Sequence, residues 1–426
     1  MSRRRRWRNS IPVSSPSSTS TPPRTWRRPR GPWGPARGHT PPSEPHGLLG
    51  DGVERVPCPS PCASRGRWAP DGRWKGIFRC RGGMEMTGRE RMLTALRRGE
   101  PDRVPVWEMA FNEESIIKLG AFFTEDLPPV KSAQKMSMEE KVKLLNTLFT
   151  VARELELDGL TSITLLGTEA VDEEHVRDGW GRILRISEEG EATAVGGPVS
   201  EPSDLKAIKP YHPQQTDFLM LLASKGNLGE DYAQVLVQPG PFRESWSLLG
   251  SMEKLLYYYV KNPGFVKDLA RLVTDYILEV VDMAADLGAD VIALDGDLAF
   301  SQSTLMSPAQ YEEFVFPFHR EITEQAHRRG MLIIKHSDGN MWPILDGIVE
   351  AGFDGFHPVQ PQCMDIGEVK ARYGDRLCIL GNIDCTYLLP FGSPEEVEET
   401  VKETIRVAAP GGGYVISSSN SIHPGC

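Results

Sequence analysis

The chain has 426 residues, of which 39% are hydrophobic, and its formal net charge is −10. This length admits one large domain or two or three smaller ones, and no run of about 18 apolar residues is present that could span a membrane. The seven cysteines include no CxxC pair. Their sparse spacing argues against a disulfide scaffold and indicates a reduced, cytoplasmic protein.

The charge is divided unevenly along the chain. Residues 1–83 carry 17 Lys and Arg residues against 4 Asp and Glu residues, whereas residues 84–426 carry 31 against 54. A strongly acidic body repels other polyanions. We therefore expect neither nucleic acid nor an anionic membrane as a partner of the folded part.

The first segment, residues 1–83, has no helical or strand periodicity and is rich in Pro, Gly, Ser and Arg. Such a composition cannot bury enough apolar surface to offset its ordering entropy, so we predict disorder. We interpret this segment as an extension from a start site placed too early, because a capping box of Thr87 and Glu90 opens a protein-like sequence just after Met86. An arginine-rich arm that binds nucleic acid is the alternative.

From residue 84 onward, short apolar runs alternate with amphipathic segments. Eight runs are typical of buried parallel strands, at residues 104–107, 160–164, 234–238, 291–294, 331–335, 355–357, 377–381 and 413–417. Helix-length segments lie between most of them, which predicts an α/β fold over residues 84–426, a single-domain (β/α)8 TIM barrel. Period-two alternation over residues 180–195 predicts a β-hairpin inserted after the second strand. An open doubly wound sheet is the alternative, although no Gly-rich phosphate turn follows the first strand.

Polar residues follow seven of the eight predicted strands, at the end where barrels carry their chemistry. The run that ends at His336 continues directly into Ser337 and Asp338, and a helix cap would explain Asp338 but not His336. Clustered aspartates repel one another unless a cation or a shared proton intervenes. We predict catalytic roles for Asp295, Asp297, Asn382 and Asp384, and substrate-binding roles for Glu108, Asn112, Gln238, Arg243, His357 and Gln360. For each residue taken alone, the cap of a loop is the alternative.

Four motifs make residues 86–426 similar to the uroporphyrinogen decarboxylase superfamily. They are Thr87-Gly-Arg-Glu-Arg-Met-Leu-x4-Arg98-Gly-Glu-Pro-Asp-Arg-Val-Pro, Ser307-Pro-x2-Tyr-x2-Phe-x2-Pro317, Gly381-Asn-Ile-Asp and Ala409-Pro-Gly-Gly-Gly-Tyr414. The resemblance implies a (β/α)8 barrel. It also implies one of two activities, decarboxylation of uroporphyrinogen III without a cofactor or methyl transfer, commonly between a corrinoid and a thiol that zinc activates.

The decarboxylase branch fits this sequence poorly. Its members carry Arg-Gln-Ala-Gly-Arg-Tyr after the first strand, where this chain has Trp107-Glu-Met-Ala-Phe-Asn112. The aspartate that the resemblance places near residues 161–164 is absent, and Asn420-Ser-Ile stands where decarboxylases have His-Gly-Ile. A polyanionic tetrapyrrole would therefore meet no arginine clamp.

The methyltransferase branch fits better. The resemblance places its metal ligands, a His-x-Cys pair and a later Cys, at His336, Asp338 and Asn420 of this chain. Loss of both thiolates favours a harder or weaker site, so we expect a divalent metal that is zinc or a harder ion. We predict metal-assisted methyl transfer between a small methylated compound or a corrinoid and an acceptor, with a corrinoid as a co-substrate and a corrinoid protein as a partner.

Two other functions stay open at this point. One is uroporphyrinogen III decarboxylation in porphyrin and haem biosynthesis, and the other is a degenerate barrel that binds a small molecule without turning it over. Members of the superfamily continue past the loop after the eighth strand into a final helix, whereas this sequence ends at Cys426. We therefore expect a barrel truncated at its C-terminus, without that helix.

Overall fold

The computed structural model describes residues 67–68, 74–75, 85–187 and 192–426. The chain divides into two compact units, Met1–Ala63 and Ser64–Cys426, and the first lies outside the described residues. The prediction for residues 1–83 therefore concerns a segment of which only two short antiparallel strands are described, β1 (Arg67–Trp68) and β2 (Trp74–Lys75).

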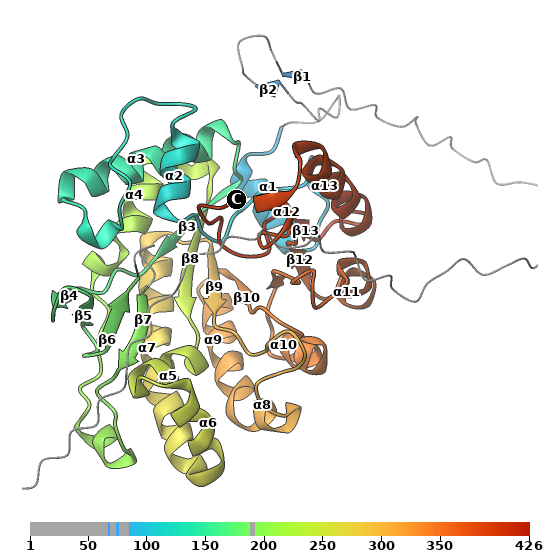
Figure 1. Cartoon of the computed structure of the whole chain (residues 1–426). Coiled ribbons are helices and arrows are strands. Elements are labelled where there is room, and N and C mark those ends of the chain that lie inside the picture. Colours follow the sequence, from blue (N-terminus) through green and yellow to red (C-terminus); the bar gives the residue numbers. More distant parts are fainter. Residues whose placement is uncertain (1–66, 69–73, 76–84, 188–191) are drawn as a thin grey trace, which may run out of the picture. The chain divides into compact units, whose positions relative to one another are not determined.

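A parallel sheet of seven strands forms the centre of the second unit (Figure 1). From edge to edge its strands are β3 (Gly159–Ile163), β8 (Ala233–Pro239), β9 (Val291–Asp295), β10 (Leu332–His336), β11 (Gly355–His357), β12 (Cys378–Leu380) and β13 (Tyr414–Val415). Spatial neighbours follow one another in this sheet, with helices in the connections, as right-handed βα units require. The predicted TIM-barrel-like α/β fold is confirmed.

The predicted strand 104–107 is wrong in detail. Val106 makes only an isolated bridge with Ile416. The segment nevertheless joins the two edges of the sheet, because the Trp107 amide donates to the Ile416 carbonyl (3.1 Å) and the Asp158 amide to the Val106 carbonyl (2.8 Å). Pro105 lacks an N–H, so a regular ladder cannot form here. The eighth position of the barrel is thus occupied by an irregular segment.

Helices connect and flank the strands. They are α1 (Gly88–Leu96), α2 (Glu113–Gly120), α3 (Met138–Glu154), α4 (Leu219–Leu228), α5 (Pro241–Leu249), α6 (Met252–Lys261), α7 (Pro263–Leu287), α8 (Pro308–Phe314), α9 (Phe316–Arg328), α10 (Leu345–Glu350), α11 (Ile366–Tyr373), α12 (Leu388–Phe391) and α13 (Pro394–Ala408). Short 3-10 turns are η1 (Ala133–Lys135), η2 (Pro202–Ala207), η3 (Gln215–Phe218), η4 (Gly229–Asp231) and η5 (Trp342–Ile344). Within the described ranges, no helix is long and apolar enough to cross a membrane.

Local sequence explains several helix starts. Thr87 and Glu90 form the predicted capping box of α1, and Ser307 and Ser393, each followed by proline, begin α8 and α13 with the same kind of cap. Helix α1 packs against β3, β8 and β13. Its Arg91 also pairs with Asp158, which directly precedes β3, so α1 lies over the amino ends of the strands.

A second, antiparallel sheet follows β3. Its strands, in spatial order, are β4 (Thr168–Ala170), β5 (His175–Asp178), β6 (Ile183–Ile186) and β7 (Ala192–Gly196). The sequence predicted a hairpin over residues 180–195, and β6 and β7 are antiparallel neighbours, but they belong to a larger four-stranded sheet. Strand β7 packs against α5 (Figure 1).

Strand alternation decides which side chains fill the barrel. Buried apolar residues of one cluster, among them Val235, Ala293 and Ile334, face α1 and one another inside the ring. Side chains on the same face recur every second residue, so the residues two positions after Ala293 and Ile334, Asp295 and His336, form the next layer toward the carboxyl ends. The interior of the barrel is thus apolar, and a polar layer that includes Asp295 and His336 lies above it at the carboxyl ends of the strands.

Candidate active site and metal centre

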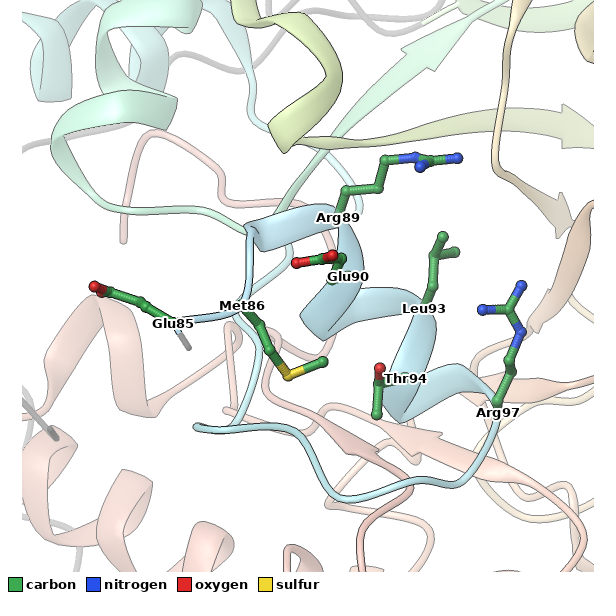
Figure 2. Close-up of a pocket in the computed structure, with 7 residues that line it drawn as sticks. All are labelled: Glu85, Met86, Arg89, Glu90, Leu93, Thr94 and Arg97. Atoms are coloured by element: carbon green, nitrogen blue, oxygen red, sulfur yellow. The ribbon is translucent and has the colours of Figure 1, made fainter. Parts of the chain in front are cut away.

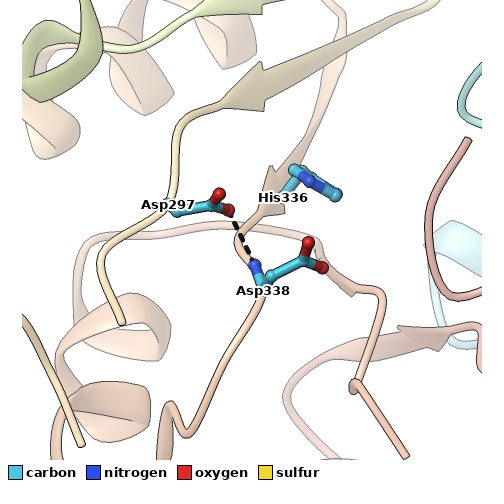
Figure 3. A group of neighbouring side chains, drawn as sticks. All are labelled: Asp297, His336 and Asp338. Atoms are coloured by element: carbon cyan, nitrogen blue, oxygen red, sulfur yellow. Dashed lines mark hydrogen bonds between the residues drawn. The ribbon is translucent and has the colours of Figure 1, made fainter. Parts of the chain in front are cut away.

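Three side chains at the carboxyl end of the sheet form a cluster with the ligand types of a metal site. Asp297 lies on the loop after β9, His336 ends β10, and Asp338 lies two residues further on. One ligand atom from each lies within 4.8 Å of the others. The Asp338 amide donates to Asp297 Oδ1 at 2.9 Å, the dashed line in Figure 3. The neighbouring positions of β9 and β10 explain this convergence, because their carboxyl ends share one edge.

Asp338 carries one carboxylate oxygen with a partner and one without. Asn420 Nδ2 donates to its Oδ2 at 2.5 Å, whereas its Oδ1 is buried and finds no hydrogen-bond partner within the described part of the chain. Burial raises the pKa of the Asp338 carboxyl to about 6, and the charges of Asp297 and Asp295 add to this. An orphaned buried carboxylate oxygen is costly unless a cation or a proton satisfies it.

The donor set fits a divalent cation. It offers one imidazole nitrogen and two carboxylates, which suits zinc with water completing its shell, or a harder ion. Asp297, which the sequence indicated as catalytic, takes the third place in this set. Asn420, predicted as a ligand, presents its amide N–H to Asp338, while its Oδ1 accepts from the Ser421 amide at 2.7 Å. In this arrangement Asn420 orients Asp338 and does not offer an oxygen to the cluster.

His336 is almost fully buried, with 5% of its surface exposed. Its Nε2 lies 3.9 Å from Asp295 Oδ1, and its Nδ1 lies 2.7 Å from Nδ1 of His357. His357 has no exposed surface, and burial, together with the nearby His336, lowers its pKa well below the usual histidine range. In this structure the His357 ring is enclosed and both of its nitrogens have partners, and its substrate contact stays a prediction.

Asp295 and Arg243 form an ion pair at the same end. The Arg243 side chain is 43% exposed, so it lies at the rim and partly neutralises the acidic cluster.

Lys335, which sequence reasoning did not single out, is 1% exposed and points away from the barrel interior by strand alternation. Its Nζ donates to the carbonyls of Gly296 and His336, each at 2.7 Å, and burial lowers its pKa to about 8. In the sequence, the signal that could have identified Lys335 is a lysine at the end of an apolar run.

Glu108 lies on the irregular segment that closes the ring and faces the extension of β13. The Ser418 amide donates to its Oε2 at 3.0 Å, and the hydroxyls of Ser417 and Ser418 donate to the same oxygen. Burial raises the pKa of the Glu108 carboxyl to about 7. Glu108 therefore exchanges a proton near neutral pH, which suits an acid–base role better than a purely electrostatic substrate contact.

The other predicted residues surround this centre with different degrees of access. Gln360 Oε1 accepts from the Gly339 amide at 2.8 Å, and Asn382 Nδ2 donates to the Val359 carbonyl at 2.9 Å, so both fasten loops. Asp384 caps its own turn, accepting from the Thr386 amide at 2.8 Å. Gln238 has no exposed surface in this structure, and its substrate contact stays a prediction. These side chains support the loops around the cluster.

Two cavities lie away from the cluster. One of about 590 Å³ is lined by residues of the α1 region alone, Glu85, Met86, Arg89, Glu90, Leu93, Thr94 and Arg97 (Figure 2), and thus belongs to the amino end. A second, of about 320 Å³, borders the start of α2 and includes Asn112 among its lining residues. Asn112, the residue that precedes α2, is the only predicted site residue among the lining residues of these two cavities.

Comparison with known proteins decides the family. The model of the family described as "Uroporphyrinogen decarboxylase (URO-D)" matches residues 181–426. The chain belongs to the uroporphyrinogen decarboxylase family. Its relatives include the uroporphyrinogen decarboxylase of Pseudoalteromonas atlantica, 22% identical over 345 residues that cover 78% of this chain and 91% of the relative. That of Hydrogenovibrio crunogenus is 23% identical over 350 residues, 79% of this chain and 92% of the relative.

A solved structure of similar fold is a methyltransferase from Methanosarcina mazei. It has a TM-score of 0.61 and 20% sequence identity, and the match covers 80% of this chain and 94% of that one. Membership of the uroporphyrinogen decarboxylase family and this barrel thus agree with the resemblance seen in the motifs. Which reaction the family fold serves here depends on the residues at the carboxyl end of the sheet.

Proposed function

We propose that Asp297, His336 and Asp338 bind a divalent cation and that the protein is a metal-assisted methyltransferase, moving a methyl group between a small methylated compound or a corrinoid and an acceptor. The observation that carries this proposal is the buried Oδ1 of Asp338, which has no hydrogen-bond partner in the described part of the chain and lies beside an imidazole and a second carboxylate. The methyltransferase of similar fold supports it. A corrinoid protein is the expected partner.

Asp297, His336 and Asp338 would hold the cation. Asn420 keeps the Asp338 carboxylate in place through its 2.5 Å hydrogen bond. A bound divalent cation would supply Lewis acidity that lowers the pKa of a thiol or water reaching it. Glu108, whose pKa is about 7, can take up or release a proton at its Oε2 at neutral pH.

Decarboxylation of uroporphyrinogen is the second candidate, favoured by the names of the curated relatives. A substrate with many carboxylates needs cationic partners. Arg243 stands at the rim, but it is already paired with Asp295. Asp297 and Asp338 lie at the same end, so the local charge opposes such a substrate. The third candidate function is that of a barrel that binds a small molecule without turning it over.

The test uses the purified full-length chain, its His336→Ala variant and, as a matched control, Asp268→Asn on the exposed surface of α7. Zn²⁺ and Mn²⁺ binding is measured by calorimetry, and demethylation of methylcobalamin by a panel of thiols is followed spectroscopically. We expect a cation to bind the wild-type chain and the control but not His336→Ala, and demethylation to follow cation occupancy.

Three results would decide against the proposal. Cation binding unchanged in His336→Ala would remove the site, and turnover of uroporphyrinogen III without methylcobalamin demethylation would select the decarboxylase. Binding of small methylated compounds without any turnover would select the non-catalytic barrel.

A further inference from the structure

The pairing of β10 with β11 places a second buried histidine, His357, beside His336 of the cluster. His336 of β10 stands opposite His357 of β11 in the parallel register, and their ring centroids are 5.0 Å apart. Their Nδ1 atoms are 2.7 Å from one another. A hydrogen bond of that length between two ring nitrogens contains one hydrogen, so one ring must donate and the other must accept.

The second nitrogen of His357 decides which ring accepts. Its Nε2 lies 3.2 Å from the Ser418 carbonyl oxygen and 3.2 Å from Ser417 Oγ. A carbonyl oxygen only accepts, so His357 Nε2 carries a hydrogen. The ring has no exposed surface, and within the described residues its hydrogen bonds go to His336, Ser417 and Ser418 rather than to a carboxylate. A buried imidazole without an anionic partner stays neutral, which leaves His357 Nδ1 unprotonated.

Trp107 keeps the His357 ring in this orientation. The indole meets the imidazole edge to face, with ring centroids 5.4 Å apart and an interplanar angle of 72°. Trp107 Nε1 in turn donates to Thr161 Oγ1 at 3.1 Å, and that hydroxyl donates to the Glu108 carbonyl. The accepting nitrogen is therefore held in place by a hydrogen-bonded and packed frame.

We propose that His357 is a positioning residue that fixes His336 as the tautomer protonated on Nδ1. The consequence is that His336 Nε2, which lies 3.9 Å from Asp295 Oδ1 and is the ring nitrogen not engaged by His357, presents a lone pair to a cation held with Asp297 and Asp338. An Nε2 that carries the ring hydrogen cannot ligate a cation. His357 opposes that tautomer by drawing the hydrogen of His336 to the other side of the ring. This inference rests on the proposed cation site and adds the group that makes its nitrogen ligand competent.

The first measurement reads the tautomer directly, without any metal. Two-bond ¹H–¹⁵N correlation spectra of the full-length chain labelled with ¹⁵N-histidine, with His336→Gln used to assign the signals, distinguish Nδ1–H from Nε2–H. We expect His336 to be the Nδ1–H tautomer and His357 the Nε2–H tautomer at pH 8. An Nε2–H signal from His336 in the wild-type chain would overturn the proposal.

The second measurement compares two substitutions by Zn²⁺ binding. His357→Phe keeps a ring against Trp107 and removes the acceptor, whereas His357→Asn can place an amide oxygen where Nδ1 stood. Because a partner of a metal-ligating histidine sets its tautomer, we expect Zn²⁺ affinity to fall about 10–100-fold in His357→Phe and to recover in His357→Asn. Equal affinities in the wild-type chain and a folded His357→Phe would overturn the proposal.

The two measurements separate the two ideas. If the wild-type chain binds no Zn²⁺, the proposed function loses its cation site, and the tautomer spectra alone decide the role of His357. If His357→Phe fails to fold by circular dichroism, the wild-type spectra still decide it. If the wild-type spectra agree with the expectation but the Zn²⁺ affinity of a folded His357→Phe equals that of the wild-type chain, another group sets the tautomer of His336 and the proposal is overturned.

Discussion

The two ends of the barrel differ in how far their buried carboxylates are paired with cationic side chains. At the amino end, Arg91 and Arg103 both pair with Asp158, and Arg91 also pairs with Asp102. The carboxylate of Asp158 is 1% exposed and is matched by two guanidinium groups. At the carboxyl end, carboxylates gather around His336, and one buried oxygen has no hydrogen-bond partner among the residues that the structure describes. We infer that the first end is organised for stability, whereas the proposed cation would account for the uncompensated charge at the second.

The largest expected effect is at the amino end. Arg91→Met removes a partner of Asp158 and leaves a buried carboxylate with less compensation, so we expect a loss of about 3–5 kcal/mol in the free energy of unfolding. Urea titration followed by circular dichroism measures this. Arg103→Met, at a side chain 25% exposed, serves as the comparison and should cost less. Equal, small losses in both variants would contradict the view that this end is organised for stability.

A smaller loss is expected from Lys335→Met. The substitution keeps the buried stem and removes three donors, to the carbonyls of Leu294, Gly296 and His336, so we expect about 1–3 kcal/mol of destabilisation. Because these carbonyls flank Asp297 and Asp338, hydrogen exchange should also accelerate in the loops after β9 and β10. Unchanged exchange there would show that Lys335 does not fasten the loops.

Asp338→Asn should have opposite effects on stability and on binding. The Asp338 carboxyl has a pKa of about 6 in the folded chain against 3.8 in the unfolded one, so the folded chain binds more protons between these values. The stability that this provides is complete below pH 3.8 and is lost as the pH rises through 6. At pH 8 and without metal, we therefore expect Asp338→Asn to gain about 1–2 kcal/mol in unfolding titrations while losing affinity for Zn²⁺. A destabilised variant at pH 8 would break the comparison between the two ends.

The smallest effect is expected from Glu108→Gln. The Glu108 carboxyl, with a pKa of about 7 against 4.5 when unfolded, follows the same sign, so its contribution is lost between about pH 4.5 and 7. Wild-type stability relative to Glu108→Gln should decline from pH 5 to pH 8, by about 1 kcal/mol after allowance for partial solvation. Parallel pH dependences of the two proteins would show that Glu108 is ionised throughout.

Much of the scaffold was predictable because its signals are local. Buried parallel strands appear as short apolar runs, and the seven strands of the parallel sheet fall where such runs occur. The run at residues 104–107 was misread because its apolar composition outweighed the signal of Pro105, which lacks the N–H that a regular ladder needs. The third member of the cluster, Asp297, was recognised as a polar strand-end residue, but its place beside Asp338 depends on a turn that only the folded backbone defines.

Side-chain partners were less predictable than positions. His357 was expected at a strand end, which is correct, but its orientation toward His336 follows from the parallel register of β10 and β11, which single-sequence patterns do not specify. Gln238 and His357 both lie at strand ends and both are enclosed. Proximity to the carboxyl end of a strand therefore predicts a neighbourhood, whereas access to substrate depends on which loops fold over it.

The capping boxes of α1, α8 and α13 have a consequence for how the chain acquires its structure. Each start is encoded within four residues, so these helices can begin without long-range contacts. Joining Glu108 to Ser418, by contrast, closes a loop between residues 310 positions apart, which carries a large entropic cost before any contact repays it. Ring closure is thus the step that depends most on the rest of the barrel being in place.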